Sequence, residues 1–311
     1  MGALLSAVGD QVRGIWQGRR PYQTVAIVVG GLLILSGIFH FAVFLVQGGP
    51  WAGPVSWRKP VTFGLSFGLT AATLGWLVGY LRDSRPLAVA VWTLAISSFI
   101  EVFLVAMQQW RGVPSHFNES TPFDTIVFSL MGLTVSFIGL SILFFMIRGF
   151  REVRADAGMK LAVRGGLALL FVGQFLGLAI ILNARERDND PAATGLNIFG
   201  AAGVMKVPHA VALHAIQILP LLALLLTLTS MEENQRRRIV VTAAGGYLGI
   251  AAVSALQTFS GLAPFDLTTV AGVIALVSLA LLLTALVKLL MGLRSAWAHG
   301  RIGPPVGLTG V

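Results

Sequence analysis

The chain has 311 residues, of which 56% are hydrophobic and only 11% are charged. A soluble domain carries about 25% charged residues, so this composition excludes an ordinary soluble protein. The formal net charge of +9 comes from basic residues that cluster between apolar segments, and no nucleic-acid-binding motif accompanies it. The absence of cysteine excludes disulfides, thiolate metal sites, iron–sulfur clusters and covalently attached c-type haem.

The apolar residues form eight segments of about 20 residues or more, the length that a helix needs to cross a bilayer. None shows the alternating pattern of a barrel strand, and lipid leaves helices as the remaining solution. We therefore predict an all-α integral membrane protein with about eight transmembrane helices. The predicted spans are 24–46, 60–81, 87–109, 123–147, 161–183, 209–230, 239–260 and 267–291.

Basic residues between the predicted spans set the orientation, because loops rich in lysine and arginine stay on the cytoplasmic side. The basic linker 148–160 and the tail 292–311 then lie inside, as does the segment 1–23 before the first span. That span exceeds the apolar core of a signal peptide and lacks a small-x-small cleavage site, which indicates a retained anchor. Residues 3–16 fit either an amphipathic helix on the membrane surface or a frayed tail. The pattern predicts a bacterial-type inner (plasma) membrane protein with both termini in the cytoplasm.

Similar sequence landmarks occur in both halves of the chain. Gln109-Trp-Arg-Gly is followed, after a short loop, by Pro122-Phe-Asp and a long apolar run. Gln257-Thr-Phe-Ser-Gly is followed by Pro264-Phe-Asp and another apolar run. An ordinary helix start can also place proline and aspartate before an apolar run, so this motif alone has a simpler explanation.

A second pair of landmarks favours an internal duplication. A lysine and a proline open an apolar run in each half, and 148 residues separate Pro60 from Pro208, as they separate Gln109 from Gln257. We predict a 4+4 duplication with units 24–147 and 161–291. Four spans per unit preserve the orientation, so the copies would be related by a parallel pseudo-twofold axis along the membrane normal.

The plan of eight spans in two groups of four, with both ends inside, is similar to that of haem A synthases. The resemblance covers the plan only. The haem ligands of that family come from even-numbered spans in both halves, and the second, fourth and eighth spans contain no histidine here. No activity and no residue role is therefore carried over from that family.

Polar side chains within the spans gather in the half nearer the outer face. His40 and His214 both lie about 10 Å below the outer interface, given a rise of about 1.5 Å per residue. Glu101 and Gln217 fall about one turn deeper, and Gln217 shares a helix face with His214. Because polar groups in a bilayer cost free energy, each is a candidate functional residue. The halves also differ at the outer face, where the first inserts a segment that contains His116.

Three kinds of site fit this layer, and the first is a b-type haem. His40 and His214, at matched depth, can ligate one iron from opposite sides. Arg58, Lys59 and Arg111 sit just above, where they can pair with the propionates. The simpler alternative is that each histidine only hydrogen-bonds a neighbouring helix.

The second kind is a transition-metal site. His40, His214 and Glu101 supply two imidazoles and a carboxylate, which leaves coordination positions open. A metal-bound water there can carry out hydrolytic or oxidative chemistry, with His116 or His209 as an extra ligand or proton carrier.

The third kind has no cofactor. Glu101 and the histidines then form a protonatable pocket in a transporter, or in a protein that binds a quinone or another lipophilic molecule. A transport path needs polar residues in both the outer and the inner half of the predicted spans, and the inner half contains few. We therefore favour a haem- or metal-binding membrane oxidoreductase or electron-transfer protein, with Glu101, His116 and His209 as catalytic residues. Trp57 and Trp110 are typical interfacial anchors.

Overall fold

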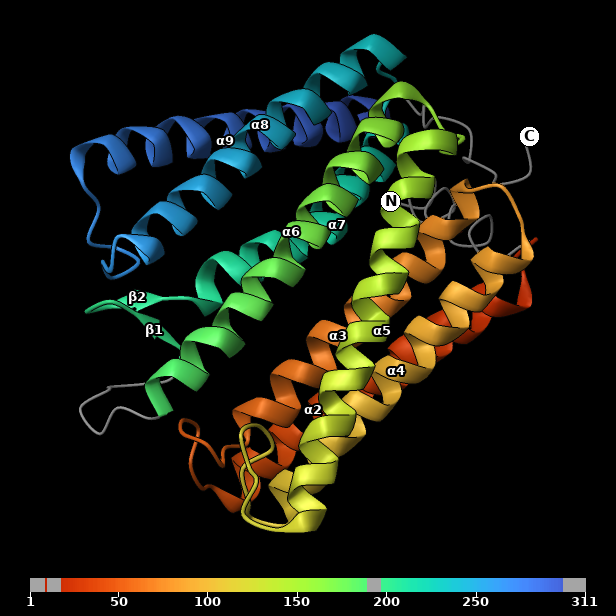
Figure 1. Ribbon diagram of the computed structural model, residues 1–311. Coiled ribbons are helices and arrows are strands. Elements are labelled where there is room, and N and C mark those ends of the chain that lie inside the picture. The colour runs from red at the N-terminus through yellow and green to blue at the C-terminus, as the bar shows by residue number, and fades with distance from the viewer. Residues whose placement is uncertain (1–8, 10–17, 189–196, 299–311) are drawn as a thin grey trace. The chain divides into compact units, whose positions relative to one another are not determined.

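A computed structural model describes Gly9, residues 18–188 and residues 197–298, and these are almost wholly helical (Figure 1). Within these ranges, eight helices are long and apolar enough to cross a membrane, which confirms the prediction of an all-α multi-pass membrane protein. The N-terminal segment, which fits either an amphipathic helix or a frayed tail, and much of the predicted tail 292–311 lie outside the described residues. The long helices are α2 (Pro21–Gln47), α3 (Arg58–Leu77), α4 (Arg85–Trp110), α5 (Pro122–Glu152), α6 (Ala157–Asp188), α7 (Lys206–Thr227), α8 (Glu233–Phe259) and α9 (Thr269–Ala298).

Most of the helices run past the ends of the predicted apolar spans. The helix α5 continues to Glu152 and α6 begins at Ala157, so most of the predicted linker 148–160 is helical. The helix α6 also continues to Asp188, into the loop predicted between the spans 161–183 and 209–230. That loop ends in a short antiparallel pair, β1 (Ile198–Phe199) with β2 (Gly203–Val204). These extensions are polar turns of helix. A hydropathy pattern detects only the apolar part of a helix, whereas the helix itself can continue beyond the hydrocarbon layer.

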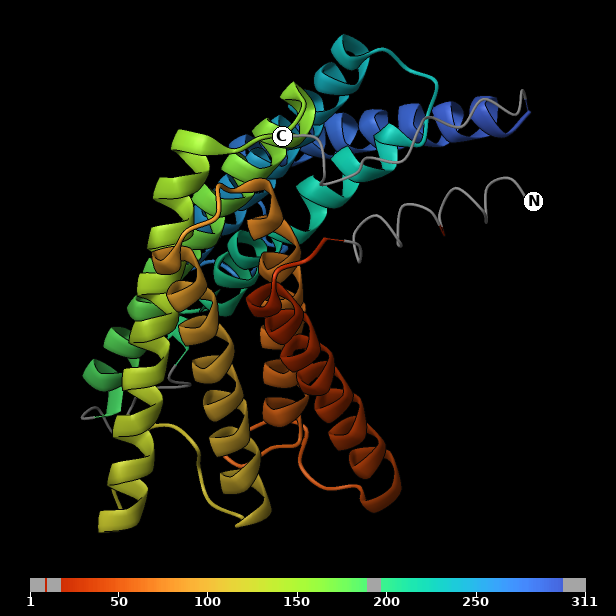
Figure 2. The ribbon, with the colours of Figure 1, turned by 90° about the vertical axis from the view of Figure 1, so that its right-hand side faces the viewer.

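The chain divides into two compact units, Arg19–Arg148 and the part from Gly149 onward. In the first unit, α2 and α3 run side by side in close contact (Figures 1 and 2). A Cβ atom on Gly30 would lie 2.6 Å from the Gly68 carbonyl oxygen, and one on Gly37 would lie 3.0 Å from the Leu65 nitrogen. Glycine at these positions lets the two backbones meet, as small residues commonly do between membrane helices.

In the second unit, α6 and α7 form an equally close pair. A Cβ atom on Gly166 would lie 2.8 Å from the Ile216 Cα, and one on Gly173 would lie 2.8 Å from a Leu213 methyl group. These contacts recur at fixed intervals: 136 residues separate the two glycines of α2 from those of α6, and 148 residues separate their partners. The first helix pair of each unit is therefore packed in the same register.

The turn after the third helix of each unit also has the same backbone geometry. Gly112 has φ of 69° and Gly261 has φ of 72°, a left-handed conformation that glycine adopts at low cost. The carbonyl oxygens of Gln108 and Gln257 each accept from the amide five residues later, at 3.1 and 3.0 Å. In this turn geometry Gln257 matches Gln108, at an interval of 149, whereas the sequence landmarks pair Gln257 with Gln109 at an interval of 148. The internal duplication itself stays a prediction.

The two Pro-Phe-Asp motifs have different structures. Pro122 begins α5, and the preceding Thr121 caps it by accepting from the Asp124 amide at 3.1 Å. The second motif, at Pro264, lies in a turn, and α9 begins only at Thr269. The same three residues start a helix in one unit and precede it in the other.

The α8–α9 pair is built on small residues. Buried positions of α9 recur every seven residues at Ala271, Ser278, Ala285 and Gly292. A Cβ atom on Gly246 of α8 would lie 2.7 Å from the Ser278 carbonyl oxygen. The rest of the α9 surface carries exposed leucine and valine, as expected for a helix that faces lipid.

Candidate functional site

The most deeply buried carboxyl group of the first unit belongs to Glu101, which is 0% exposed. It lies in the middle of α4, where its Oε2 accepts a hydrogen bond of 2.7 Å from the Thr134 hydroxyl of α5. Its Oε1 is buried and has no hydrogen-bond partner in the described structure. An unpartnered buried oxygen is costly, so this atom needs a proton, a water molecule or a ligand.

The contacts of Thr134 bear on the proton of Glu101. The Thr134 hydroxyl oxygen lies 2.7 Å from Glu101 Oε2 and 2.9 Å from the Met131 carbonyl oxygen. A hydroxyl has one hydrogen and cannot donate to both acceptors at once. A protonated Glu101 satisfies both contacts, since its O–H can donate to Thr134 while the threonine hydrogen goes to Met131. An ionised Glu101 takes the threonine hydrogen, and the Met131 carbonyl oxygen then keeps only its helical partner, the amide four residues later.

An apolar layer lies next to Glu101 along α4 and α5. It consists of Leu104, Val105, Val127 and Met131, with Phe63 of α3 packed against it. The four central side chains are at most 7% exposed. They separate Glu101 from the polar end of the unit by about one helical turn.

Beyond this layer, a buried polar network joins the end of α4 to the start of α5. Asp124 forms an ion pair of 2.6 Å with Arg111 and accepts from Gln108 Nε2 at 2.9 Å. Its second oxygen accepts from the Thr121 hydroxyl at 2.6 Å. The Arg111 guanidinium also lies 4.7 Å from the ring centre of Phe123. Arg111 is thus held by an internal partner, and its predicted pairing with an anionic cofactor group stays a prediction.

His40 is held by hydrogen bonds at both ring nitrogens. Its Nδ1 lies 2.7 Å from the Ser36 carbonyl oxygen, so this nitrogen carries the hydrogen. Its Nε2 then accepts from the indole N–H of Trp110 at 3.1 Å. The rings of Trp57 and Trp110 complete an aromatic cluster, with centroids 5.2 Å apart. In this arrangement the imidazole is neutral and has no open lone pair for a metal.

A second group of predicted site residues lies close together at the start of α3. Lys59, the second residue of α3, donates to the Ser115 hydroxyl at 3.4 Å, and that hydroxyl lies 2.9 Å from His116 Nδ1. The His116 ring is 5.4 Å from the ring of Phe63, which also packs on the apolar layer. Arg58 begins the same helix. The loop that contains His116 therefore folds back over its own unit.

In the second unit, His209 ties α7 to α6. Its Nδ1 donates to the Gly173 carbonyl oxygen at 2.8 Å. A Cβ atom on Gly177 would lie 2.9 Å from the imidazole Cε1, so the ring occupies the space that this glycine leaves open. His214 and Gln217 lie on α7, both half-buried.

The predicted ligands are thus divided between the two units. His40, Glu101, Lys59, Arg111 and His116 belong to the first, and the α7 residues belong to the second. A haem or metal site shared by His40 and His214 stays a prediction. Among the described residues, no group of three His, Asp or Glu side chains is arranged to hold a metal ion.

Sequence reasoning missed the partners of Glu101. Gln108 follows Glu101 by seven residues on α4, and on α5 Met131 follows Asp124 by seven, as Thr134 follows Val127. A spacing of seven places two residues on the same face of their own helix. It does not identify the helix that this face packs against, so the pairing of Glu101 with Thr134 could not be read from the sequence.

Comparison of the chain with protein-family models, with curated proteins and with solved structures finds no match. Function is therefore inferred from the chemistry of the described side chains.

Proposed function

We propose that the protein is a cofactor-free membrane transporter that carries protons, in which Glu101 binds and releases the proton. One observation carries this proposal: among the described residues, the fully buried Glu101 carboxyl has a threonine hydroxyl as its only hydrogen-bond partner, and its second oxygen has none. A charge buried in this way is costly without a cation beside it, and no described residue forms an ion pair with Glu101.

Thr134 keeps a hydrogen bond to Glu101 in both protonation states. When Glu101 is protonated, it donates to Thr134, and the threonine donates to the Met131 carbonyl. When the proton leaves, the threonine hydroxyl rotates and donates to the carboxylate, so the contact between the two side chains persists. The change requires rotation of one hydroxyl group and no movement of a helix.

Buried hydroxyl groups continue from Glu101 toward the other end of α4 and α5. Ser97 and Ser98 lie one turn before Glu101 on α4, and Ser141 lies two turns after Thr134 on α5; each is at most 5% exposed. The polar network around Asp124 lies on the opposite side, behind the apolar layer. The inner half has few polar residues, but these three hydroxyls lie on one side of Glu101 and the polar network lies on the other, which favours a transporter over a protein that only binds a quinone or another lipophilic molecule.

A haem- or metal-binding oxidoreductase is the second proposal, and it rests on the predicted depths of His40 and His214. It requires His40 Nε2 to give up its bond from Trp110, which costs about 0.5–1.5 kcal/mol. A purified, haem-replete sample with a Soret band, or with a bound transition metal by elemental analysis, would support it. A sample with neither would remove it.

The proposal includes an internal duplication and a cytoplasmic location for both termini. The equal register of α2–α3 and α6–α7, and the matching turns at Gly112 and Gly261, support the duplication. The excess of basic residues on one side supports the orientation and a bacterial-type inner membrane.

Proton movement can be measured in proteoliposomes that contain a pH-sensitive dye, with a membrane potential imposed by potassium and valinomycin. We expect the wild type to carry protons and Glu101→Gln to reduce the rate at least tenfold, because the amide keeps the shape but cannot release a proton. Glu119→Gln, on an exposed loop residue, is the matched control and should leave the rate unchanged. Equal rates for the wild type and Glu101→Gln would contradict the proposal.

A further inference from the structure

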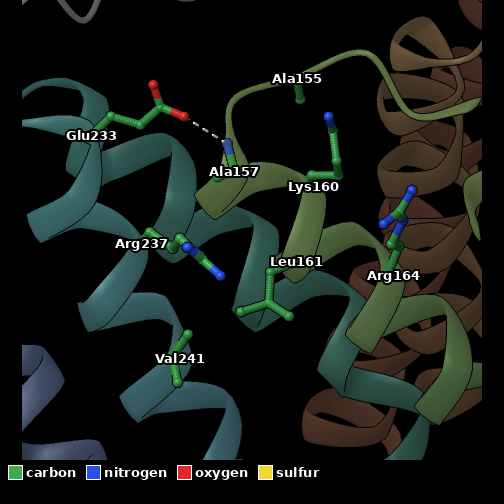
Figure 3. A pocket seen from close by; sticks show the side chains of 8 residues that line it. All are labelled: Ala155, Ala157, Lys160, Leu161, Arg164, Glu233, Arg237 and Val241. Atoms are coloured by element: carbon green, nitrogen blue, oxygen red, sulfur yellow. Dashed lines mark hydrogen bonds between the residues drawn. The ribbon is translucent and has the colours of Figure 1, made fainter.

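A cavity of about 410 Å³ opens in the second unit, where α6 and α8 begin (Figure 3). Lys160 and Arg164 of α6 and Arg237 of α8 supply three positive charges to its wall. Glu233 is the one acidic residue in this wall. The cavity is therefore electropositive and lies well away from Glu101 in the chain.

Two of the three cations have no side-chain partner among the residues that the structure describes. The side chains of Lys160 and Arg237 form no hydrogen bond or ion pair with the described part of the chain. Arg164 instead donates to the carbonyl oxygens of Gly149 and Phe150, at 3.2 and 2.7 Å. Arg164 is thus a fixed charge, whereas the other two can close on a ligand.

The single acidic residue is already engaged. Glu233 Oε1 accepts from the Ala157 amide at 3.0 Å, which holds the start of α6 against the start of α8 (Figure 3). Its other oxygen remains an acceptor for a ligand hydroxyl. A ligand that fits this wall thus carries an anionic group for the cations and a hydroxyl group for Glu233.

Apolar side chains line the same wall as the basic residues. Leu161 lies between Lys160 and Arg164 on α6, and Val241 lies one turn after Arg237 on α8. Both helices are long enough to span a membrane, and the cavity lies at their first turns. Cations beside apolar side chains at the end of a span suit a phospholipid, which has an anionic phosphate next to its acyl chains.

We propose that this cavity binds the headgroup of an anionic phospholipid with a hydroxylated headgroup, such as phosphatidylglycerol. Lys160 and Arg237 contact the phosphate, Arg164 adds a fixed charge, and Glu233 accepts from a headgroup hydroxyl. Leu161 and Val241 contact the start of an acyl chain. The volume falls within the range of about 300–1,000 Å³ that is typical of small-molecule sites. The proposal is independent of Glu101, because it concerns different helices and no proton transfer.

The test is native mass spectrometry of the delipidated protein, with phosphatidylglycerol, phosphatidylcholine and inorganic phosphate as separate additives. We expect one phosphatidylglycerol bound with high affinity and much weaker binding of phosphatidylcholine. The double variant Lys160→Gln/Arg237→Gln should weaken phosphatidylglycerol binding about 30-fold, the scale of two lost contacts between a cation and an anionic lipid. The control, Arg151→Gln/Arg238→Gln, changes the net charge equally at exposed residues outside the wall and should have little effect.

A further variant, Val241→Trp, fills the cavity without changing the charge and should also abolish tight binding. It keeps the proposal testable if the double variant does not fold. Equal binding of the two lipids, or an equal loss in the control variant, would overturn the proposal. Displacement of the lipid by millimolar inorganic phosphate would overturn the lipid as the ligand and assign the site to free phosphate.

Discussion

Three side chains define the chemistry inside the first unit: His40, Glu101 and Thr134. Both ring nitrogens of the histidine form hydrogen bonds, and its Nε2 accepts the one from the Trp110 indole N–H. The glutamate has one engaged oxygen and one without a partner. Of the two titratable groups, Glu101 therefore has the atom that can take a proton from outside the fold.

The bond from Trp110 to His40 can be tested by stability. Trp110→Phe keeps an aromatic ring but removes the N–H donor, which leaves the Nε2 of a buried imidazole without a partner. We expect a loss of about 1–3 kcal/mol in the free energy of unfolding. Thermal unfolding in detergent measures it, with Trp92→Phe as the control because Trp92 is 44% exposed and has no such bond. Equal effects of the two substitutions would show that the bond contributes nothing.

The burial of His40 and Glu101 could be predicted from their depth in the spans, but their partners could not. The position of a residue along a helix determines how deep it lies in the membrane, but it does not determine which neighbouring helix its side chain faces. Trp110 lies 70 residues from His40, and Thr134 lies 33 residues from Glu101. Only the packing of α2 and α5 against α4 brings these pairs together.

At the scale of elements, the two Pro-Phe-Asp motifs make different contacts. Asp124 joins α4 to α5 through Arg111 and Gln108, whereas the corresponding Asp266 is exposed and its carboxylate forms no hydrogen bond or ion pair with the described residues. In the second unit, Gln257 donates to the Asp266 backbone carbonyl oxygen at 2.6 Å. The first turn is therefore fixed by charge and the second by backbone contacts.

Substitution of the two aspartates separates these roles. Asp124→Asn removes the charge that Arg111 faces, and because Arg111 is 36% exposed we expect a moderate loss of about 1–3 kcal/mol. Asp266→Asn should change the stability by less than about 0.5 kcal/mol. Thermal or denaturant unfolding of the two variants provides the measurement. A larger loss for Asp266→Asn would contradict the assigned contacts.

The existence and the order of the helices followed from hydropathy, because each apolar run matches the bilayer thickness. The register between helices did not follow. Gln108 and Gln109 look equivalent in the sequence, but only Gln108 accepts the turn hydrogen bond before Gly112 that Gln257 accepts before Gly261. Register depends on which side chain faces the neighbouring helix, which a single hydropathy profile does not contain.

At the scale of the whole molecule, the two units have the same helix-pair register but different polar contents. The first contains the buried carboxyl group and its network, and the second contains the cationic cavity. We infer that proton handling belongs to the first unit and lipid recognition to the second.

The predicted orientation can be tested with single cysteines, because the chain has none of its own. Ala52→Cys lies in the exposed loop after α2, and Arg154→Cys lies between α5 and α6. A membrane-impermeant maleimide added to intact spheroplasts should label the first variant, and should label the second only after lysis. The reverse pattern would invert the topology and place the cationic cavity outside.

The most direct test of the central claim is infrared difference spectroscopy of the purified protein, comparing the wild type with Glu101→Gln as the pH is raised. The wild type should show a carboxylic acid C=O band that is absent from Glu101→Gln. That band should disappear reversibly on titration, and it should shift in Thr134→Val, where its hydrogen-bond partner is lost. If Glu101 contributes no carboxylic acid band, or one that persists until the protein unfolds, Glu101 is not the group that binds and releases the proton.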